Sequence, residues 1–264
     1  MSRKITLLNG EEWLVNELVD NMTDDDFYYD YLGVDKCLSS SSTKLLFPNP
    51  KKFLLSRGHK EKPSLEMKLG NVLHTKILEP SKFDERFQVV DASTRNTNIY
   101  KEAEALYNEK MCILEKEDRA MNYCVDAVWS CNEAIELLST PMKEVPNIIT
   151  YRGIPFRMKA DAINIKKEAV VDVKTTSNVN EFRHSAYTYN YDVQAFLYTL
   201  GFDIPNMIFL VVDKGNFTVG IAKADADFIA RGKQKLDEAV DNYMRFFDAL
   251  ATDDVNDYYV NIQL

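Results

Sequence analysis

Apolar residues recur every three to four positions in several stretches of the chain, which is the spacing of an amphipathic helix. Serines precede two such stretches, at residues 39–42 and at Ser64, and serine is a favoured N-cap residue. Pro48 and Pro80 mark where these two helices are expected to end. In the second helix the apolar positions are Leu65, Leu69, Val72, Leu73 and Ile77. The N-terminal part of the chain is therefore expected to be helical.

The same pattern predicts the elements that follow. Helical spacing indicates two helices in residues 99–139, with Cys112 and Leu114 on their apolar stripe, one helix from about 179 to 200 and a last one from about 225 to 250. After Pro141 the apolar period changes to two, which predicts strands at residues 148–151, 154–163, 169–174, 207–213 and 217–222. The chain is thus expected to form an α/β domain with a helical N-terminal part.

The formal net charge of the 264 residues is −9, and it is unevenly distributed. Residues 1–35 hold nine acidic and two basic side chains (−7), residues 224–264 hold nine and four (−5), so residues 36–223 carry +3. An acidic protein does not suggest a nucleic-acid partner, whereas a mildly basic centre is compatible with one. We interpret residues 1–35 as an acidic peripheral arm and residues 36–264 as the functional domain, with the acidic ends away from any bound nucleic acid.

Hydrophobic residues make up 45% of the chain, enough for a core without disulfide bonds. No run of 18 apolar residues is present, and the first ten residues lack the apolar stretch of a signal peptide. We therefore expect a cytoplasmic protein with no membrane segment. The four cysteines form no C-x-x-C pair and are expected to be reduced.

Two aspartates stand out on a hairpin predicted in residues 156–174. If the chain reverses about residues 166–167, paired positions sum to 333, and Asp161 lies opposite Asp172 with their Cβ atoms roughly 5 Å apart. Opposed like charges are destabilising unless a proton or cation lies between them, and a divalent cation is the simplest candidate. Replacing Asp172 by Asn is then expected to leave the metal-free protein at least as stable.

Two alternatives stay open at this point. The carboxylates are otherwise ordinary charges on the solvent face of a hairpin. A loop with an odd number of residues would shift the register and separate them. Lys174 shares a strand face with Asp172, so its ammonium group can reach the same place.

Three motifs in this order resemble the PD-(D/E)XK nuclease superfamily. Asp161, ten intervening residues and Asp172-Val-Lys174 resemble its D-x(n)-(D/E)-x-K signature, although Ala160 stands where the family has proline. Gly70-Asn-Val-Leu-His74 resembles the G-x-x-x-H helix of the RecB-like branch, and Gln194-Ala-Phe-Leu-Tyr198 resembles its Q-x-x-x-Y helix. The likeness covers roughly residues 36–215 and extends to phage-type exonucleases related to exonuclease VIII (RecE) and, more distantly, lambda exonuclease.

The resemblance implies a PD-(D/E)XK core, a mixed central sheet flanked by helices, and a Mg²⁺-dependent deoxyribonuclease in which Mn²⁺ substitutes. It implies that the metal is held by His74, Asp161, Asp172 and the carbonyl of Val173. It also implies catalytic contributions from Lys174, Glu144, Gln194 and Tyr198.

Relatives degrade one strand of linear duplex DNA from the 5′ end and form rings. The resemblance therefore implies a 5′→3′ exonuclease in phage-type recombination or DNA processing that acts on linear duplex ends. It also implies a ring-forming homo-oligomer and a single-strand annealing protein as partner.

Other residues refine this interpretation. Iron–sulfur members of the superfamily need three clustered cysteines after the Q-x-x-x-Y helix, and no cysteine follows Cys131, so no Fe–S cluster is expected. Arg95, Arg183 and His184 are candidates for DNA phosphate contacts, with solvated loops as an equal alternative. The competing functions are a structure-specific or single-strand endonuclease and a non-catalytic DNA-binding protein that retains the nuclease fold.

Overall fold

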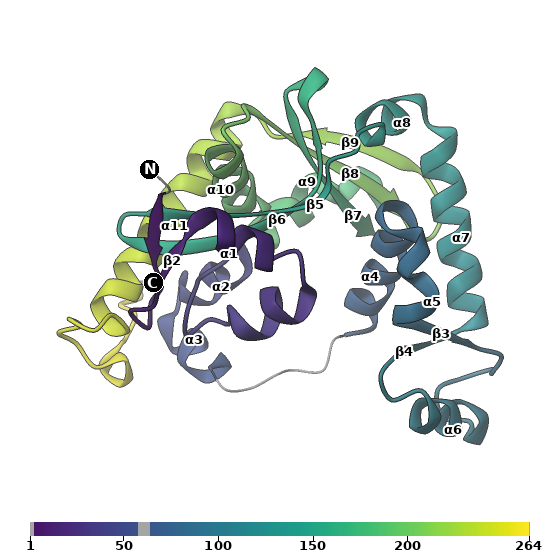
Figure 1. Ribbon diagram of the computed structural model, residues 1–264, viewed down its shortest axis with the longest axis horizontal. Coiled ribbons are helices and arrows are strands. Elements are labelled where there is room, and N and C mark those ends of the chain that lie inside the picture. The colour runs from purple at the N-terminus through teal and green to yellow at the C-terminus, as the bar shows by residue number, and fades with distance from the viewer. Residues whose placement is uncertain (1–2, 58–63, 264) are drawn as a thin grey trace.

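A five-stranded sheet forms the centre of the computed structural model, which describes residues 3–57 and 64–263 (Figure 1). The strands lie in the order β5 (Lys143–Tyr151), β6 (Ile154–Asn164), β7 (Ala169–Thr176), β8 (Asn206–Asp213) and β9 (Val219–Lys223). Strands β7 and β8 are parallel, and the other neighbours are antiparallel. The mixed sheet and its five strands confirm the prediction, although β5 begins at Lys143 and not at Ile148.

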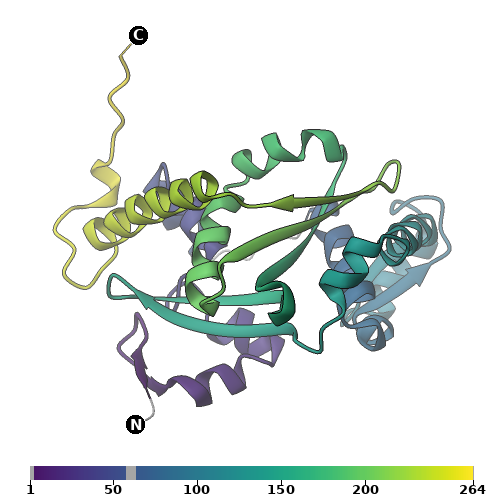
Figure 2. The same ribbon diagram turned by 90° about the horizontal axis from the view of Figure 1, so that it is seen from above.

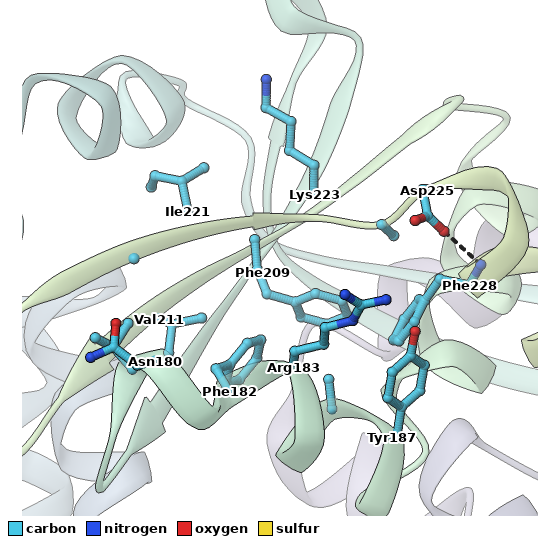
Figure 3. A pocket seen from close by; sticks show the side chains of 15 residues that line it. Asn180, Phe182, Arg183, Tyr187, Phe209, Val211, Ile221, Lys223, Asp225 and Phe228 are labelled. Carbon is cyan, nitrogen blue, oxygen red and sulfur yellow. Dashed lines mark hydrogen bonds between the residues drawn. The ribbon is translucent and has the colours of Figure 1, made fainter.

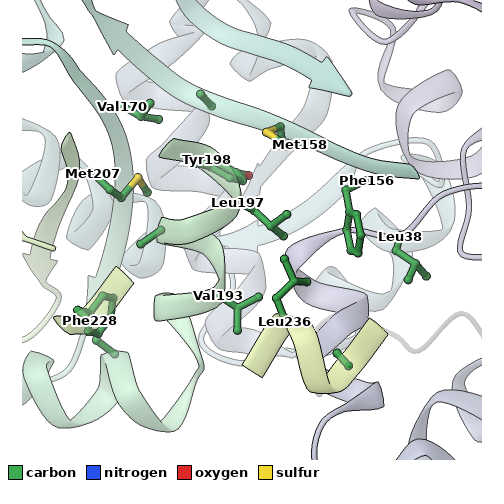
Figure 4. Close-up of a cluster of buried hydrophobic side chains, with 14 of the residues drawn as sticks. Leu38, Phe156, Met158, Val170, Val193, Leu197, Tyr198, Met207, Phe228 and Leu236 are labelled. Carbon is green, nitrogen blue, oxygen red and sulfur yellow. The ribbon is translucent and has the colours of Figure 1, made fainter. Parts of the chain in front are cut away.

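Helices cover both faces of this sheet (Figure 1 and Figure 2). One face packs against α2 (Ser40–Leu46), α3 (Pro50–Ser56), α9 (Phe182–Thr188), α10 (Tyr191–Phe202) and α11 (Ala226–Phe246). Figure 4 shows this core, where Met158 and Met207 of the sheet meet Leu197 and Leu236 of the helices. The opposite face packs against α4 (Leu65–Leu78), α7 (Glu115–Ser130) and α8 (Asn132–Leu138). Because both faces are covered, β7 and β8 are nearly continuous apolar runs.

Side-chain caps fix the starts of the two helices predicted in the N-terminal part. Ser39 Oγ accepts a hydrogen bond from the Ser42 amide (3.3 Å), and Ser42 Oγ accepts one from the Ser39 amide (2.7 Å), which closes a capping box on α2. Ser64 Oγ accepts a hydrogen bond from the Met67 amide (3.3 Å) at the start of α4. Both predicted helices are confirmed, and α4 carries His74.

The prediction of two helices in residues 99–139 is wrong. The structure has α6 (Asn98–Leu106), a strand β4 (Met111–Leu114), α7 and α8, and β4 pairs in parallel with β3 (Phe87–Val90). Cys112 and Leu114 are buried in β4 and do not lie on a helix. An apolar run of four residues fits a short buried strand as well as a helical turn, so periodicity did not separate the two.

The helix predicted at residues 179–200 is divided into a 3-10 turn (Val179–Glu181), α9 and α10. The break lies at Asn190, whose φ of +53° is left-handed, a conformation that asparagine adopts more readily than most residues. After the break α10 packs along α11, where a Cβ on Gly232 would lie 1.9 Å from the Asp192 carbonyl oxygen. The last predicted helix is confirmed as α11, with Asp225 as its N-cap. Of the helices in the described ranges, none is both long and apolar enough to span a bilayer.

Residues 3–35 have a small core of their own. β1 (Lys4–Thr6) pairs with β2 (Glu12–Leu14), and α1 (Val15–Asn21) and a π-helical turn (Phe27–Tyr31) follow. Ile148 of β5 belongs to the same cluster as their apolar side chains, among them Ile5, Leu18, Met22, Tyr28 and Leu32. This segment is therefore packed against the first strand of the central sheet.

Candidate active site

The two predicted aspartates lie where strands β6 and β7 stop pairing. The ladder pairs Ala162 with Val171 and Asn164 with Ala169, so paired positions sum to 333 as predicted, and Asp161 and Asp172 occupy the next opposing positions. Both aspartates are buried. The Val173 amide donates to Asp161 Oδ2 (2.6 Å), which holds this carboxylate against β7.

The observed hairpin loop explains why the predicted register is correct, although two consecutive lysines are not a favoured two-residue turn. The reversal takes four residues, a 3-10 turn at Ile165–Lys167 followed by Glu168 in a left-handed conformation (φ +46°). Asn164 caps this turn by accepting a hydrogen bond from the Lys167 amide (3.1 Å). An even number of loop residues centred on 166–167 keeps the sum of paired positions unchanged.

Three side chains from three elements converge beside β7. His74 of α4 places Nε2 2.7 Å from Asp161 Oδ1 and Nδ1 3.4 Å from Glu144 Oε1. One candidate ligand atom from each of His74, Glu144 and Asp161 lies within 4.8 Å of the other two. Glu144 has a φ of +51°, which is unusual for a residue other than glycine and is a form of backbone strain that gathers at functional sites.

Protons balance the charge of this cluster in the metal-free protein. Burial would lower the pKa of His74, but the carboxylates of Asp161 and Glu144 outweigh it and raise that pKa to about 9. Burial raises the pKa of Glu144 to about 7, although the His74 charge opposes this shift. An imidazolium group therefore lies between the carboxylates at neutral pH, in the place that suits a cation.

Asp172 has partners of its own. Its Oδ1 accepts a hydrogen bond from Gln194 Nε2 (2.5 Å), and its Oδ2 forms an ion pair with Lys174 Nζ. Burial raises the pKa of Asp172 in spite of the Lys174 charge. At Asp161 the charges of His74 and Lys174 outweigh burial, and its pKa is lowered. The two aspartates are thus unequal, because Asp161 favours its charged form and Asp172 does not.

The Q-x-x-x-Y helix connects to the sheet at two points. Gln194 contacts Asp172 of β7, whereas the hydroxyl of Tyr198, which is buried, donates to the Lys159 carbonyl of β6 (3.0 Å). The two side chains share a face of α10 without bonding to each other. This helix therefore fixes the spacing of the two strands at the site.

Two cavities border the carboxylates, and His74, Asp161 and Asp172 line both of them. The larger, of about 820 Å³, is also lined by Asn71, Lys174, Ser185, Tyr189, Tyr191 and Lys214. The smaller, of about 550 Å³, is also lined by Tyr28, Tyr29, Arg86, Glu144 and Lys159. The carboxylates thus border two cavities and are accessible from both of them.

The interpretation of residues 1–35 as a peripheral arm away from the site needs a correction. Asp25 forms ion pairs with Lys159 and Arg86, both at 2.7 Å, and lines the smaller cavity beside Tyr28 and Tyr29. Burial would raise the pKa of Asp25, but Lys159 and Arg86 outweigh it and lower that pKa. Attraction to these cations brings an acidic residue of the arm to the site. A domain boundary at residue 35 stays a prediction.

The three candidates for DNA contacts lie in different surroundings. Arg95 forms two hydrogen bonds with Glu117 (both 2.7 Å), which also accepts one from the Leu114 amide at the start of α7. Arg183 and His184 are exposed on α9, and Arg183 lines a separate pocket beside β9 (Figure 3). DNA contacts by these residues stay predictions, and Arg95 already has a structural partner.

Sequence reasoning missed Lys44 and Lys159. Lys44 of α2 lies 5.0 Å from the centre of the Tyr191 ring, and Lys174 lies 4.8 Å from the same ring. Burial and the Lys174 charge lower the pKa of Lys44 to about 8. Lys44 lies two residues after the capping Ser42, but nothing in the sequence places α2 beside β7. Lys159 precedes Asp161 by two residues, so strand alternation was a signal for it.

The cluster fits a divalent metal ion. Carboxylate oxygens and an imidazole nitrogen are ligands of Mg²⁺, Mn²⁺ and related ions. Glu144 Oε1 is buried and accepts no hydrogen bond from the described residues, so it has capacity for a cation. Asp172 lies next to this cluster with Lys174, and metal binding by Asp172 and by the Val173 carbonyl stays a prediction.

Comparisons with known proteins identify the family and the fold. Residues 39–251 match the family described as "PDDEXK-like domain of unknown function (DUF3799)". No curated protein matches the sequence. The solved structure of a "Putative exonuclease" from Eubacterium rectale has the same fold, with a TM-score of 0.66 and 12% identity over 84% of this chain and 85% of that one. A phage-related exonuclease from Haemophilus somnus gives a TM-score of 0.36 and 12% identity, over 78% of this chain and 93% of that one.

Metal binding is expected to release a proton from His74. Its pKa of about 9 means that the imidazole is protonated at pH 7.5 in the metal-free protein, and a metal binds only the neutral ring. Affinity for Mn²⁺ should therefore rise with pH, by up to about tenfold per unit, and level off near pH 9. Calorimetric titrations in two buffers of different ionisation enthalpy measure the released proton. Glu144, with its pKa of about 7, also releases part of a proton, so the double variant His74→Gln, Glu144→Gln should lose this buffer dependence. A wild-type heat that is the same in both buffers would contradict the assignment.

The unequal aspartates should respond differently to neutralisation. Asp172→Asn is expected to leave the metal-free protein about as stable, because two effects oppose each other. The raised pKa of Asp172 shows that its charged form is disfavoured on folding, whereas the loss of this carboxylate removes the ion-pair partner of Lys174. Asp161→Asn should lower stability by about 2 kcal/mol, since it leaves the His74 cation without its nearest partner. Thermal melts in EDTA at pH 7 compare the two variants. A melting temperature several degrees lower for Asp172→Asn than for Asp161→Asn would reverse the assignment.

Proposed function

The chain belongs to the PDDEXK-like domain family, and on this premise we propose that it is a metal-dependent DNA exonuclease that hydrolyses phosphodiester bonds. The observation that carries the proposal is the meeting of His74, Glu144 and Asp161 beside Asp172 and Lys174 at the border of two open cavities. Carboxylates, an imidazole and a lysine in this arrangement suit phosphodiester hydrolysis. The alternative of a non-catalytic DNA-binding protein is less well supported, because the residues needed for metal binding and for charge stabilisation are all present.

His74, Glu144, Asp161 and Asp172 would hold one or two Mg²⁺ ions, with Mn²⁺ as a substitute. When bound, such an ion polarises a phosphate and lowers the pKa of a water molecule. Lys174, held by Asp172, orients the attacking water and stabilises the negative charge that develops on the phosphate. Gln194 fixes the other oxygen of Asp172, so that Lys174 keeps one position. Tyr198 keeps α10 attached to β6 beside the metal ligands.

The finer features of the proposal follow the resemblance to RecE-type exonucleases. We infer 5′→3′ action on linear duplex ends in phage-type recombination or DNA processing, in the cytoplasm, by a ring-forming homo-oligomer that works with a single-strand annealing protein. The +3 charge of residues 36–223, which contain the site residues His74 to Tyr198, supports DNA as the substrate. An endonuclease remains the second candidate, because cavities on two sides of the carboxylates leave room for a strand without a free end.

Cleavage of linear and circular DNA distinguishes an exonuclease from an endonuclease. With Mg²⁺, linear duplex DNA labelled at the 5′ end should release labelled mononucleotides, whereas covalently closed circular DNA should stay intact. EDTA should abolish release. Cutting of circular single-stranded DNA would favour the endonuclease. No cleavage of any of these substrates with Mg²⁺ or Mn²⁺ would favour a non-catalytic DNA-binding protein.

Lys174→Ala should reduce cleavage to a small residual rate while metal binding persists, because the lysine acts on water and phosphate and not on the metal. We expect the rate to fall roughly 10²-fold to 10³-fold, the usual effect of removing a charge-stabilising group. Calorimetry with Mn²⁺ should show unchanged or tighter binding, since Asp172 loses its competing cation. Lys166→Ala, at the exposed tip of the same hairpin, is the matched control and should cleave normally. Loss of metal binding in a folded Lys174→Ala protein would show that the role is wrongly assigned.

A further inference from the structure

Strand β9 forms one edge of the central sheet, and no strand of the described residues pairs with its outer side. The Ala224 amide donates to the Met207 carbonyl and the Asp213 amide donates to the Thr218 carbonyl, both at 2.9 Å. The even-numbered residues of β9 and its flanks, such as Thr218 and Ala224, therefore direct their backbone N–H and C=O groups toward β8. Because this direction alternates in an antiparallel ladder, Val219, Ile221 and Lys223 turn their N–H and C=O groups outward. These groups form a template for one more strand.

Pockets on the two faces of the sheet meet at this free edge. The larger, of about 330 Å³, lies between β9 and α9 and has the aromatic side chains Phe182, Phe209 and Phe228 in its lining (Figure 3). The smaller, of about 230 Å³, includes Leu137, Ile208 and Ile221 together with the polar side chains Glu136 and Lys167. Side chains of a strand alternate between the two faces of a sheet. A strand added to β9 would thus direct its side chains into the two pockets in turn.

The C-terminal segment has the composition of such a strand. Residues 259–263 run in an extended conformation away from the body of the protein (Figure 2). The exposed fractions are 76% for Tyr259, 59% for Val260 and 78% for Ile262. Val260 and Ile262 alternate with Asn261 and Gln263, which gives an extended chain one apolar and one polar face. Exposed apolar groups in this pattern indicate a binding partner.

The segment is too short to reach β9 of its own chain. β9 leads through Asp225 into the N-terminal end of α11, and the segment follows the far end of that helix. The 21 residues of α11 span about 31 Å. The chain is held at Tyr258, whose hydroxyl donates to the Pro48 carbonyl (2.8 Å), and the five residues after it extend roughly 17 Å. Residues 259–263 can therefore reach the outer side of a β9 strand only in another molecule.

We propose that residues 259–263 of one copy of this chain add as a strand to β9 of a second copy. Val260 and Ile262 enter the pocket lined by Phe182, Phe209 and Phe228, and Asn261 faces the polar side chains of the other pocket. Asp254 and Asp257 precede the segment, and Arg183 lines the receiving pocket, so these charges are of opposite sign.

This contact is heterologous, because the tail and the edge are different surfaces. Repeated, it closes into a ring or extends into a filament. It would supply the interface for the proposed homo-oligomer, yet it does not depend on nuclease activity. Neither the segment nor β9 contributes to the lining of the two cavities at the carboxylates.

Sedimentation velocity of the full-length chain tests the proposal. The wild-type protein should form oligomers at micromolar concentration, and the double variant Val260→Asp, Ile262→Asp should be monomeric, with association weakened roughly tenfold or more. Leu250→Asp is the matched control, since Leu250 is 87% exposed and lies outside the segment. A monomeric wild-type protein, or an oligomer that survives the double variant, would overturn the proposal.

A mixing experiment tests the head-to-tail arrangement. Ile221→Pro removes an outward N–H group and no bond to β8, so it should block the edge while the sheet remains folded, which circular dichroism verifies. Each variant alone should be monomeric, and a mixture should form heterodimers, because the Pro variant keeps its tail and the double variant keeps its edge. A mixture that stays monomeric contradicts the arrangement. DNA cleavage by the double variant is a separate readout, which distinguishes a failure of this contact from a failure of the proposed nuclease.

Discussion

Two buried aspartates at opposing positions of neighbouring strands are the constraint around which this structure is organised. Such a pair is tolerated in a protein interior only when cations or protons balance it. The fold supplies one balance for each carboxylate, His74 beside Asp161 and Lys174 beside Asp172. The raised pKa of His74 follows from this requirement, because its proton takes the place of a positive ion between the carboxylates. The backbone strain at Glu144 belongs to the same arrangement, since this residue brings a third carboxylate beside His74, where its Oε1 accepts no hydrogen bond from the described residues.

The two-sided core makes this arrangement rigid. His74 comes from α4 and Gln194 from α10, and these helices pack on opposite faces of the sheet. The two side chains therefore reach Asp161 and Asp172 from different sides, at the point where the ladder between β6 and β7 ends. Close packing on both faces fixes the distance between the helices, which a site of this kind needs for constant geometry. The caps that start α2 and α4 contribute by placing Lys44 and His74 at defined distances from β7.

The acidic residues of the N-terminal segment are not all kept away from the candidate active site, although the net charges of the segments suggest it. Residues 1–35 are strongly acidic, yet Asp25 lies between Lys159 and Arg86 at the edge of the site. The local pairing of a carboxylate with two cations outweighs the general repulsion between an acidic arm and a site rich in carboxylates. The face formed by β9 is of a different kind, because its unpaired backbone and apolar pockets suit a strand and not a phosphate chain. The two aspartates lie on the inner strands β6 and β7, whereas the proposed docking strand β9 is an edge of the same sheet.

The sequence alone determined the features that depend on local patterns. The change of apolar pattern after Pro141 predicted the five strands, serine caps predicted α2 and α4, and symmetry about residues 166–167 gave the register that opposes Asp161 and Asp172. It failed where a pattern was too short to separate two structures, as at Cys112 and Leu114 in β4, and where a single left-handed residue, Asn190, divided a helix. Only the tertiary structure showed that Glu144 meets His74, that Lys44 lies over Tyr191 beside Lys174, and that Asp25 closes one side of the site. These contacts join residues that are 70 to more than 130 positions apart in the sequence. The periodicity of one helix or strand depends on its own buried face, so it does not indicate which distant element packs against that face.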